Sequence, residues 1–536
     1  MAEKEYIVTV KAGVDLNAFD AEMVASFGDE TIPNRSVEIA NARPASQRNT
    51  HYYLSDDEAT TLANDNRVIA VEIPPDQRDD IQIELKARQS GTFYRGPGSA
   101  GNLDNWGLKR CTSLTENYGN GSTPSGDQNI TQLTDDYLYP LDGTGVDVVI
   151  QDSGIQADHP EWEDANGVSR LVELDWYTAS GVSGTMPAGH YTDYNGHGTH
   201  CAGTVAGKTF GWAKNAKIYA VKINGLQGAT DPNGGIPISD IFDVIKEWHN
   251  NKPVTSTGYK RPTIVNMSWG YGTNIPDSVT PVGGVYRGTT WFWGTTYNTT
   301  GQLWSNVGVV PYYNGRWKIP VQVPSVDADV EELINAGVHV CIAAGNDYYK
   351  VTTSGEIDYN NTVSWTSYGT QNYHRPPSPY ATGAFNVGNI NSIIKNDQDA
   401  KAYDSMAGPA VTIWAPGTNI ISACSNVSEI GGPTPYKLDP AFGQQSISGT
   451  SMASPQVCGV GALHLQAKPE LTPAQLRQEI EANSPPLMLS TGFTNDYTSY
   501  TTSIMGSEGR ILYSKYNTDE SHKIEGSVTI TNLGIA

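Results

Sequence analysis

The chain has 536 residues, enough for two to four domains at about 100–200 residues per domain. Hydrophobic residues make up 38% of it and charged residues 17%, and 55 glycines with 31 prolines indicate many turns between short elements, which excludes a coiled coil or a fibre. With 34 Lys and Arg against 57 Asp and Glu, the net charge is −23, which repels phosphate backbones and anionic lipid surfaces. We therefore expect neither a nucleic acid nor a membrane as a partner.

The start of the chain and its cysteines bear on where the protein works. The first ten residues alternate charged and β-branched side chains, unlike the apolar stretch of a secretory signal. No stretch of about 20 residues is apolar throughout, so we expect no membrane-spanning helix. Five cysteines are an odd number and too dilute for a disulfide framework, so we expect them to be reduced. These features favour the cytoplasm or an assembly over conventional secretion.

Residues 1–85 are predicted to form a small module of their own. Strand-like and helical patterns follow one another in the order β-α-β-β-α-β, which is the ferredoxin-like arrangement. The predicted strands are 6–10, 36–39, 51–54 and 68–73, and the predicted helices are 16–27 and one opened by a capping box at 55–58. Residues 86–105 become charged and then rich in Gly and Ser, and are predicted to be an exposed linker.

A larger α/β domain is predicted from residue 106 to residue 489. Apolar strand runs alternate there with helical patterns, which indicates a parallel sheet covered by helices on both faces. The predicted strands are 146–150, 218–223, 264–267, 338–343, 385–390 and 411–414, and the predicted helices include 238–249, 326–336 and one opened by a capping box at 472–475. The functional groups of such sheets gather at the carboxyl ends of the strands.

Two regions depart from this alternation. Residues 271–325 are rich in Thr, Gly, Tyr and Trp without a helical period, and we expect a β-rich insertion there. It is predicted to form a packed satellite core, to select extended substrates or to provide a docking surface. Residues 490–536 are predicted to be a C-terminal extension that ends in a strand at 527–531.

Three short motifs contain residues with catalytic chemistry. Asp152 ends an apolar strand and is followed by Ser and Gly, a pattern that by itself more often marks a turn or a cap. His197 opens a helix of small residues, and with His200 it could instead bind a metal on one helical face. Ser451 lies at a helix start beside Gly and Thr, where a serine is usually a cap.

Taken together, the three motifs stand in the order Asp, His, Ser that is found in subtilisin. The chain resembles the subtilisin-like serine proteases, or subtilases, in Asp-Ser-Gly at 152–154, His-Gly-Thr-His-Cys-Ala-Gly at 197–203 and Gly-Thr-Ser-Met-Ala-Ser-Pro at 449–455. The resemblance implies a subtilisin-like fold and a serine endopeptidase. In this enzyme Ser451 would attack the peptide bond, His197 would transfer the proton and Asp152 would orient His197.

The resemblance also implies the other site residues. Asn346 is expected to stabilise the oxyanion together with the backbone N–H of Ser451. The expected substrate-binding residues are Ser268, Trp269, Gly270, Ala344 and Gly345. No cofactor is needed for this chemistry, but structural calcium is common in the family, and residues 231–235 are a candidate loop for it. We assign no metal ligands.

The first module is expected to keep the enzyme latent. Residues 1–85 resemble the inhibitory prodomain of the family, and residue 106 resembles the start of the mature enzyme. The expected partners are thus a polypeptide substrate and the chain's own prodomain, whose tail is predicted to pair with the strand edge at 266–270. The family-level expectation at P1, the residue before the cut, is large and apolar or aromatic, while the negative charge weakly favours basic substrates. The alternative function is a zymogen-like structural component of a larger assembly, such as a phage particle.

Overall fold

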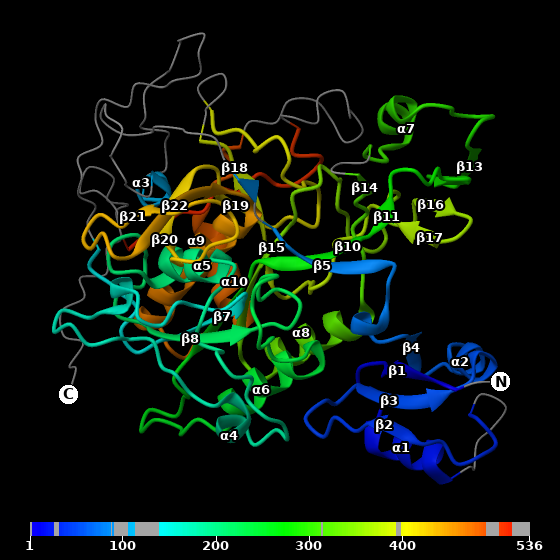
Figure 1. Cartoon of the computed structure of the whole chain (residues 1–536), viewed down its shortest axis with the longest axis horizontal. Helices are drawn as coiled ribbons and strands as arrows, with labels where there is room; N and C mark the ends of the chain where they lie inside the picture. Colours follow the sequence, from blue (N-terminus) through cyan, green and yellow to red (C-terminus); the bar gives the residue numbers. More distant parts are fainter. Residues whose placement is uncertain are drawn as a thin grey trace.

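A computed structural model gives the fold of the chain (Figure 1). It describes residues 3–25, 32–86, 88–89, 106–112, 139–311, 315–392, 398–488 and 503–516. Most of the predicted linker and the predicted strand at 527–531 lie outside these residues. Figure 1 shows a small N-terminal module, drawn in blue, beside a larger body built of strands and helices.

The N-terminal module has the predicted ferredoxin-like arrangement. Its antiparallel strands stand in the order β2-β3-β1-β4, and side chains from both helices enter one shared core with the strands. The predicted capping box opens α2, with the Ser55 hydroxyl accepting from the N–H of Glu58 and the Glu58 carboxylate accepting from the N–H of Ser55. The elements are β1 (Lys4–Val10), α1 (Leu16–Ala25), β2 (Ile39–Asn41), β3 (Asn49–Leu54), α2 (Asp56–Leu62) and β4 (Val68–Glu72).

A six-stranded parallel sheet forms the centre of the larger body, in the order β19-β18-β15-β9-β7-β8. Its strands are the predicted ones, because long apolar runs are what a sheet covered on both faces requires. Their bounds are β7 (Asp147–Asp152), β8 (Lys217–Lys222), β9 (Thr263–Met267), β15 (His339–Ala343), β18 (Phe385–Ile390) and β19 (Ile413–Pro416).

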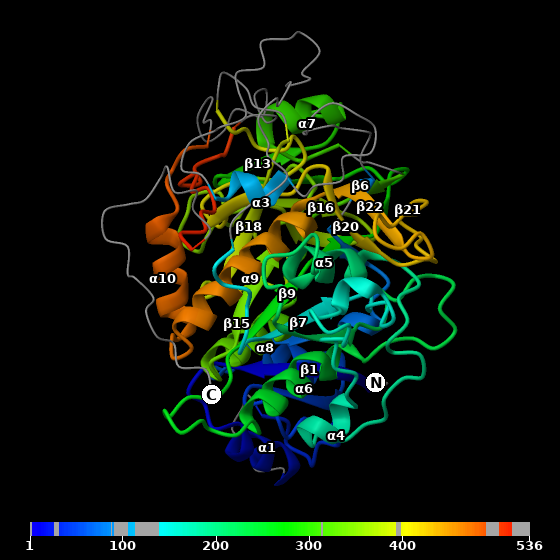
Figure 2. The same ribbon diagram turned by 90° about the vertical axis from the view of Figure 1, so that its left-hand side faces the viewer.

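Helices cover both faces of this sheet. Neighbouring residues of β7 point to opposite sides: Val148 and Ile150 belong to the core shared with α5 and α9, and Val149 belongs to the core shared with α6 and α8. Figure 2 shows α9 beside strands β15 and β9. The covering helices are α4 (Trp176–Ser180), α5 (His197–Ala206), α6 (Ile238–Asn250), α8 (Pro324–Asn335), α9 (Thr450–Ala467) and α10 (Pro473–Asn483). Within the described part of the chain, no helix has the length and apolarity needed to cross a bilayer.

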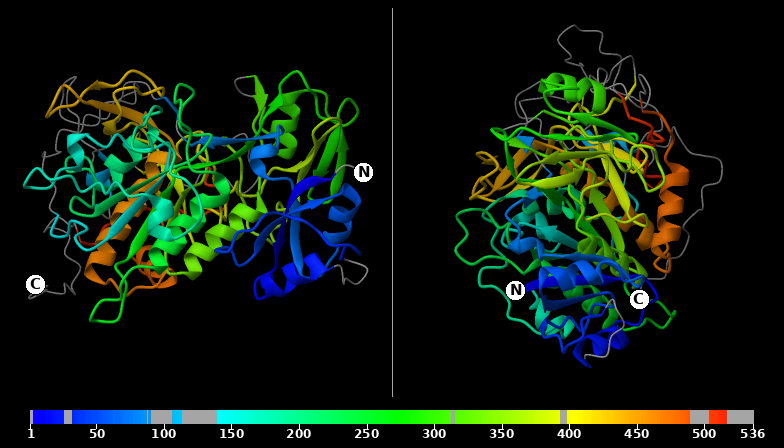
Figure 3. Two further views of the ribbon diagram at one scale, coloured as in Figure 1. Left: turned by 60° about the horizontal axis from the view of Figure 1, so that its bottom comes forward. Right: turned by 90° about the vertical axis from the view of Figure 1, so that its right-hand side faces the viewer.

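The N-terminal module lies against one end of the larger body (Figure 3). A buried network of charges joins it to α6 and α8. The guanidinium of Arg43 lies 3.1 Å from carboxylate oxygens of both Asp243 and Asp329, and none of these side chains is more than 5% exposed. Lys246 forms an ion pair with Glu332 in the same interface. Because unpaired charges are costly to bury, the module and the larger body satisfy one another's charged groups.

The insertion differs in part from the prediction. It contains a helix, α7 (Thr300–Val307), which its Thr- and Gly-rich sequence did not reveal. Its sheet, in the order β13-β12-β16-β17, takes two strands from beyond residue 325. Trp291 and Trp317 are buried in the main core together with residues of the central sheet, so the insertion extends that core and does not form the separate satellite core that was one of the three alternatives. The strands here are β10 (Trp269–Thr273), β11 (Ile275–Pro276), β12 (Gly283–Tyr286), β13 (Thr289–Phe292), β14 (Arg316–Trp317), β16 (Thr362–Trp365) and β17 (Gly369–Asn372).

The described part of the C-terminal segment, residues 503–516, packs beside the outer strand β19. The N–H of Trp414 donates to the carbonyl oxygen of Arg510 at 2.8 Å, and the N–H of Leu512 donates to that of Trp414 at 2.8 Å. Ile511 and Leu512 are buried in the main core. These residues of the predicted extension therefore protect an edge of the central sheet.

Candidate active site

Asp152, His197 and Ser451 come from three different elements that meet at the carboxyl edge of the sheet. Asp152 is the last residue of β7, His197 is the first of α5 and Ser451 is the second of α9. All three are fully buried. The structure thus brings together the three residues that the sequence motifs single out, at the edge where such sheets place their functional groups.

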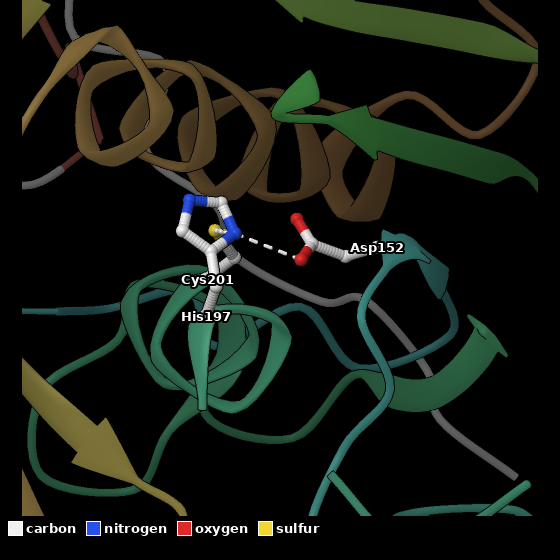
Figure 4. Close-up of side chains that lie close together, drawn as sticks. All are labelled: Asp152, His197 and Cys201. Atoms are coloured by element: carbon white, nitrogen blue, oxygen red, sulfur yellow. Dashed lines mark hydrogen bonds and ion pairs between the residues drawn. The ribbon is translucent and has the colours of Figure 1, made fainter. Parts of the chain in front are cut away.

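Asp152 and His197 form a hydrogen-bonded pair (Figure 4). The Nδ1 atom of His197 lies 2.8 Å from Oδ1 of Asp152, and this oxygen also accepts the N–H of Ser153 at 2.7 Å. Gly198 lets α5 approach the turn after β7, since a Cβ atom there would collide with the carbonyl oxygen of Gly154. The pair leaves Nε2 of His197 as the nitrogen that can accept a proton.

His197 and Ser451 are not hydrogen-bonded to each other in this structure. The Nε2 atom of His197 is buried and has no hydrogen-bond partner among the described residues. In Figure 4 it lies on the side of α9, the long helix drawn in orange-brown. The Ser451 hydroxyl donates instead to the carbonyl oxygen of Ser268 at 2.9 Å. The Ser451 hydroxyl would have to exchange this acceptor for Nε2 of His197 before its proton could be transferred.

The two groups predicted to stabilise the oxyanion both lie at the start of α9. The backbone N–H of Ser451, at the start of α9, donates to the carbonyl oxygen of Lys86 at 3.0 Å. The Oδ1 atom of Asn346 accepts from the N–H of Thr450 at 2.9 Å and from its hydroxyl at 3.0 Å. These bonds fix the amide plane of Asn346, so its orientation depends on Thr450, a residue that the sequence analysis did not single out.

A strand of the chain itself lies along the predicted substrate edge. Strand β5 (Ile81–Leu85) pairs antiparallel with β10, which Figure 1 shows side by side, and Glu84 stands opposite Gly270. The N–H of Lys86 donates to the carbonyl oxygen of Ser268 at 3.0 Å. The predicted pairing of the module's tail is confirmed, although the partner residues are 269–273 rather than 266–270.

A second short strand pairs with the chain on the other side of Ser451. The short strand β6 (Arg88–Gln89) pairs antiparallel with Ser448 and Ile447 of β22 (Gly443–Ser448). Strands β5 and β6 are thus held by pairing on the two sides of the peptide bond that follows Lys86. This bond lies beside Ser451, because the carbonyl group of Lys86 is bonded to the Ser451 N–H.

Three of the predicted substrate-binding residues, Ser268, Trp269 and Gly270, contact this path, whereas the contacts of Ala344 and Gly345 are with other parts of the chain. The carbonyl oxygen of Ser268 accepts a hydrogen bond from the N–H of Lys86, and the Ser268 hydroxyl donates to the carbonyl oxygen of Ser451 at 3.0 Å. Trp269 is buried, with its indole N–H donating to Gln151 at 3.1 Å, so it borders the path through its backbone. Gly345 donates its N–H to the Thr450 hydroxyl at 3.1 Å.

Gly270 and Ala344 are the other two predicted substrate-binding residues. Gly270 faces the side chain of Lys86 directly, and Ala344 donates its N–H to the carbonyl oxygen of Val387 at 3.0 Å. Lys86 is not among the predicted site residues, because it stands at the start of the predicted exposed linker. The available sequence signal was the alternation of apolar and polar residues over 81–86, which is typical of a strand that runs up to Lys86.

Asp152, His197 and Cys201 bring three ligand-type atoms within 4.8 Å of one another (Figure 4). Burial raises the pKa of the Cys201 thiol well above its ordinary value, which disfavours the thiolate that a metal would bind. His200, the other candidate ligand, directs Nε2 at the carbonyl oxygens of Ile420 and Gln445, at 2.9 and 3.1 Å. The five cysteines, all buried, are free thiols as predicted.

The candidate calcium loop at 231–235 already has a cation from the chain. The buried Lys222 ammonium forms an ion pair with the carboxylate of Asp231. Lys222 also donates to the carbonyl oxygen of Thr192 at 2.9 Å. A calcium ion would have to compete with this ammonium for Asp231, so calcium in this loop stays a prediction.

Comparison with known proteins decides the family. The sequence model described as "Subtilase family" matches residues 143–507, which is more than half of the chain. The chain belongs to the subtilase family. The matched residues of this subtilase include the Asp152, His197 and Ser451 motifs, and the predicted resemblance is confirmed.

Relatives of this subtilase include fungal proteases. Alkaline protease 2 of Aspergillus fumigatus is 26% identical over 359 residues, covering 65% of this chain and 52% of that protein. Subtilisin-like serine protease Rho m 2.0101 of Rhodotorula mucilaginosa is 26% identical over 369 residues, covering 66% of this chain and 76% of that protein. The chain spans about half the length of the first of these. Fervidolysin from Fervidobacterium pennivorans, a keratinolytic enzyme related to subtilisin, shares the fold at a TM-score of 0.50 and 18% identity, over 96% of this chain and 60% of that one.

Proposed function

We propose that this subtilase is a serine endopeptidase that hydrolyses polypeptides through an acyl-enzyme. The observation that carries the proposal is the hydrogen bond between the Ser451 N–H and the carbonyl oxygen of Lys86, in a segment held by β10 on one side and β22 on the other. This is the contact that a scissile carbonyl needs.

The roles follow from where charge develops. The Ser451 oxygen attacks the carbonyl carbon while Nε2 of His197 takes its proton, and Asp152 stabilises the resulting imidazolium. The negative oxygen of the tetrahedral intermediate is stabilised by the Ser451 N–H and by the side-chain amide of Asn346. His197 then protonates the leaving nitrogen. Water, deprotonated by His197, attacks the ester carbonyl, and the Ser451 oxygen leaves and takes that proton, which releases the acid and restores the enzyme.

Latency is the second part of the proposal: residues 1–85 act as a prodomain, and their last strand, β5, occupies the cleft together with Lys86. Two observations support this. Strand β5 and Lys86 fill the place of a substrate along β10, and the buried charges around Arg43 attach the module to α6 and α8. A competing polypeptide would have to displace β5 and Lys86 from the cleft, and the ion pairs of Arg43 oppose the departure of the module.

A fluorophosphonate probe tests the proposed function, because it reacts covalently with an activated serine. We expect the probe to label Ser451 of wild-type protein after the N-terminal module has been removed. The rate of casein hydrolysis should fall in proportion to the fraction of protein that is labelled. Ser451→Ala is the control and should show neither labelling nor hydrolysis. A mature, folded protein that neither reacts with the probe nor hydrolyses casein would contradict the proposal and favour the structural-component alternative.

A further inference from the structure

The side chain of Lys86 fills a closed pocket beside Ser451. It is only 7% exposed, and its Nζ donates to the carbonyl oxygen of Ala343 at 2.5 Å. Gly270 forms the opposite wall, since a Cβ atom there would collide with Cε of Lys86 and would lie 2.7 Å from its Nζ. The pocket therefore has room for a long, unbranched side chain because residue 270 is glycine, and it ends in a hydrogen-bond acceptor.

The burial of this pocket suits an amine that can lose its proton. Burial lowers the pKa of Lys86 to about 7, while the carboxyl groups of Asp347, Asp327 and Glu84 act in the opposite direction. A neutral amine still donates to the Ala343 carbonyl group. Arginine keeps its charge and has a broader, planar head group, so it would bring an obligatory cation into the same buried space.

The neighbouring residues of β5 show what the rest of the path accepts. Ile83 and Leu85 are half-buried and pack against the core that contains β10. Glu84 points the other way, where the Lys318 ammonium of the insertion lies 3.1 Å from its carboxylate. Counted back from the bond after Lys86, these residues occupy the P4, P2 and P3 positions.

We propose that this subtilase cleaves after lysine in preference to arginine or an apolar residue, with apolar residues at P2 and P4, and that the Lys86–Ala87 bond of its own chain is its first substrate. The inference rests on the proposed function and specifies its substrate class. The Ser451 oxygen bonds to the carbonyl carbon of Lys86, the bond to the Ala87 nitrogen breaks, and that nitrogen takes the proton from His197. Water then releases a Lys86 carboxylate and regenerates Ser451.

The first test follows the full chain by intact-mass measurement and N-terminal sequencing. We expect fragments that end at Lys86 and begin at Ala87, and an uncut chain for Ser451→Ala. Lys86→Arg and Lys86→Leu should each slow the cut at this bond at least about tenfold. A first cut at another bond in the wild type, or an unchanged rate at this bond in both variants, would overturn the proposal.

The second test measures kcat/KM at pH 9 on peptides Ile-Glu-Leu-X with a fluorogenic leaving group, where X is lysine, arginine or norleucine. Lysine should be preferred to arginine by about 100-fold and to norleucine by about tenfold, since only lysine can be both neutral and a donor in the pocket. A preference for norleucine or arginine would overturn the inference.

Matched glycine variants tie this selectivity to the pocket. Gly270→Ala should lower kcat/KM for the lysine peptide at least about tenfold while a peptide with alanine at P1 is spared, because the new methyl group occupies the space of Cε. Gly272→Ala is the control and should keep the lysine preference, since a Cβ atom there meets nothing closer than 3.7 Å. Equal effects of the two variants would contradict the assigned wall.

Probe labelling distinguishes a failure of the proposed function from a failure of the proposed lysine preference. A protein that reacts with the fluorophosphonate probe at Ser451 but cuts best after norleucine keeps the proposed function and loses the lysine inference. A mature protein that neither reacts with the probe nor cuts any of the peptides loses both.

Discussion

The backbone N–H of Ser451 donates to the carbonyl oxygen of Lys86 at 3.0 Å. This bond joins the start of α9 to a segment 365 positions earlier in the chain, and it places a peptide carbonyl where an oxyanion would form. In the same segment, the N–H of Lys86 donates to Ser268 and its Nζ to Ala343. The chain thus presents one of its own peptide bonds to its candidate nucleophile.

Asn346→Ala should lower kcat by about 10²–10³ with little change in KM, because its amide is expected to meet a charge that exists only in the transition state. Steady-state kinetics on the lysine peptide measure this. Thr450→Val removes one of the two bonds that hold the amide of Asn346, and should have a smaller effect in the same direction. A rise in KM with unchanged kcat for Asn346→Ala would mean that this residue binds substrate instead.

Arg43→Ala should weaken the hold of the N-terminal module by about 3–5 kcal/mol, because Asp243 and Asp329 would lose the guanidinium that they share. After the chain has been cut, the two fragments should separate on size-exclusion chromatography, whereas the wild-type fragments stay together.

Arg35→Ala is the control for the interface. Arg35 pairs with Glu58 inside the module at 2.7 Å, and its side chain is 35% exposed. Its loss should cost at most about 1 kcal/mol of module stability and leave the fragments associated. Equal dissociation of both variants would show that Arg43 has no special part in the interface.

Binding of a P1 lysine should strengthen as pH rises from about 7 to 10. The pKa of Lys86 is lowered to about 7 from 10.5 by burial, so entry into the pocket releases a proton in this range and is favoured at higher pH. Below pH 7 the side chain is protonated both in water and in the pocket, and this contribution to the pH dependence disappears.

The comparison with norleucine isolates that effect. The ratio of kcat/KM for the lysine peptide to that for the norleucine peptide removes the pH dependence of every catalytic group that the two reactions share. The ratio should rise by up to about tenfold per pH unit within the window. A ratio that stays constant or falls from pH 7 to 10 would contradict the claim that the P1 lysine binds with its amine buried and deprotonated.

Gly198→Ala should destabilise the fold by about 1–3 kcal/mol and reduce kcat, because its methyl group would push α5, and His197 with it, away from the turn at Gly154. Thermal unfolding and peptide hydrolysis measure the two effects. Gly301→Ala in α7 is the matched control: a Cβ atom there meets nothing within 4 Å, so stability should stay the same or rise slightly. A neutral Gly198→Ala would contradict the tight approach of α5 to β7.

Much of the fold could be predicted because local patterns agree with it. The six central strands are continuous apolar runs, and the capping boxes at Ser55 and Thr472 open helices as expected. The positions of Asp152, His197 and Ser451 followed from motifs that each lie within a few residues.

The missed features depend on contacts between distant parts of the chain. Lys86 acquires its environment from Gly270 and Ala343, which lie nearly 200 residues or more away, and a Gly- and Ser-rich stretch just after it suggested a linker. The helix α7 is short and weakly patterned, and strands β16 and β17 join the insertion only through tertiary pairing. No local periodicity reports such pairings.

The central claim is that Ser451 is an activated nucleophile covered by the chain's own segment until the bond after Lys86 has been cut and the N-terminal fragment has dissociated. Intact-mass spectrometry of full-length protein during incubation with a fluorophosphonate probe tests it most directly. The account predicts that the label appears only on the fragment that begins at Ala87, on the peptide that contains Ser451, and never on the uncut chain. Labelling of the uncut chain at the same rate, or a label on another residue, would contradict it.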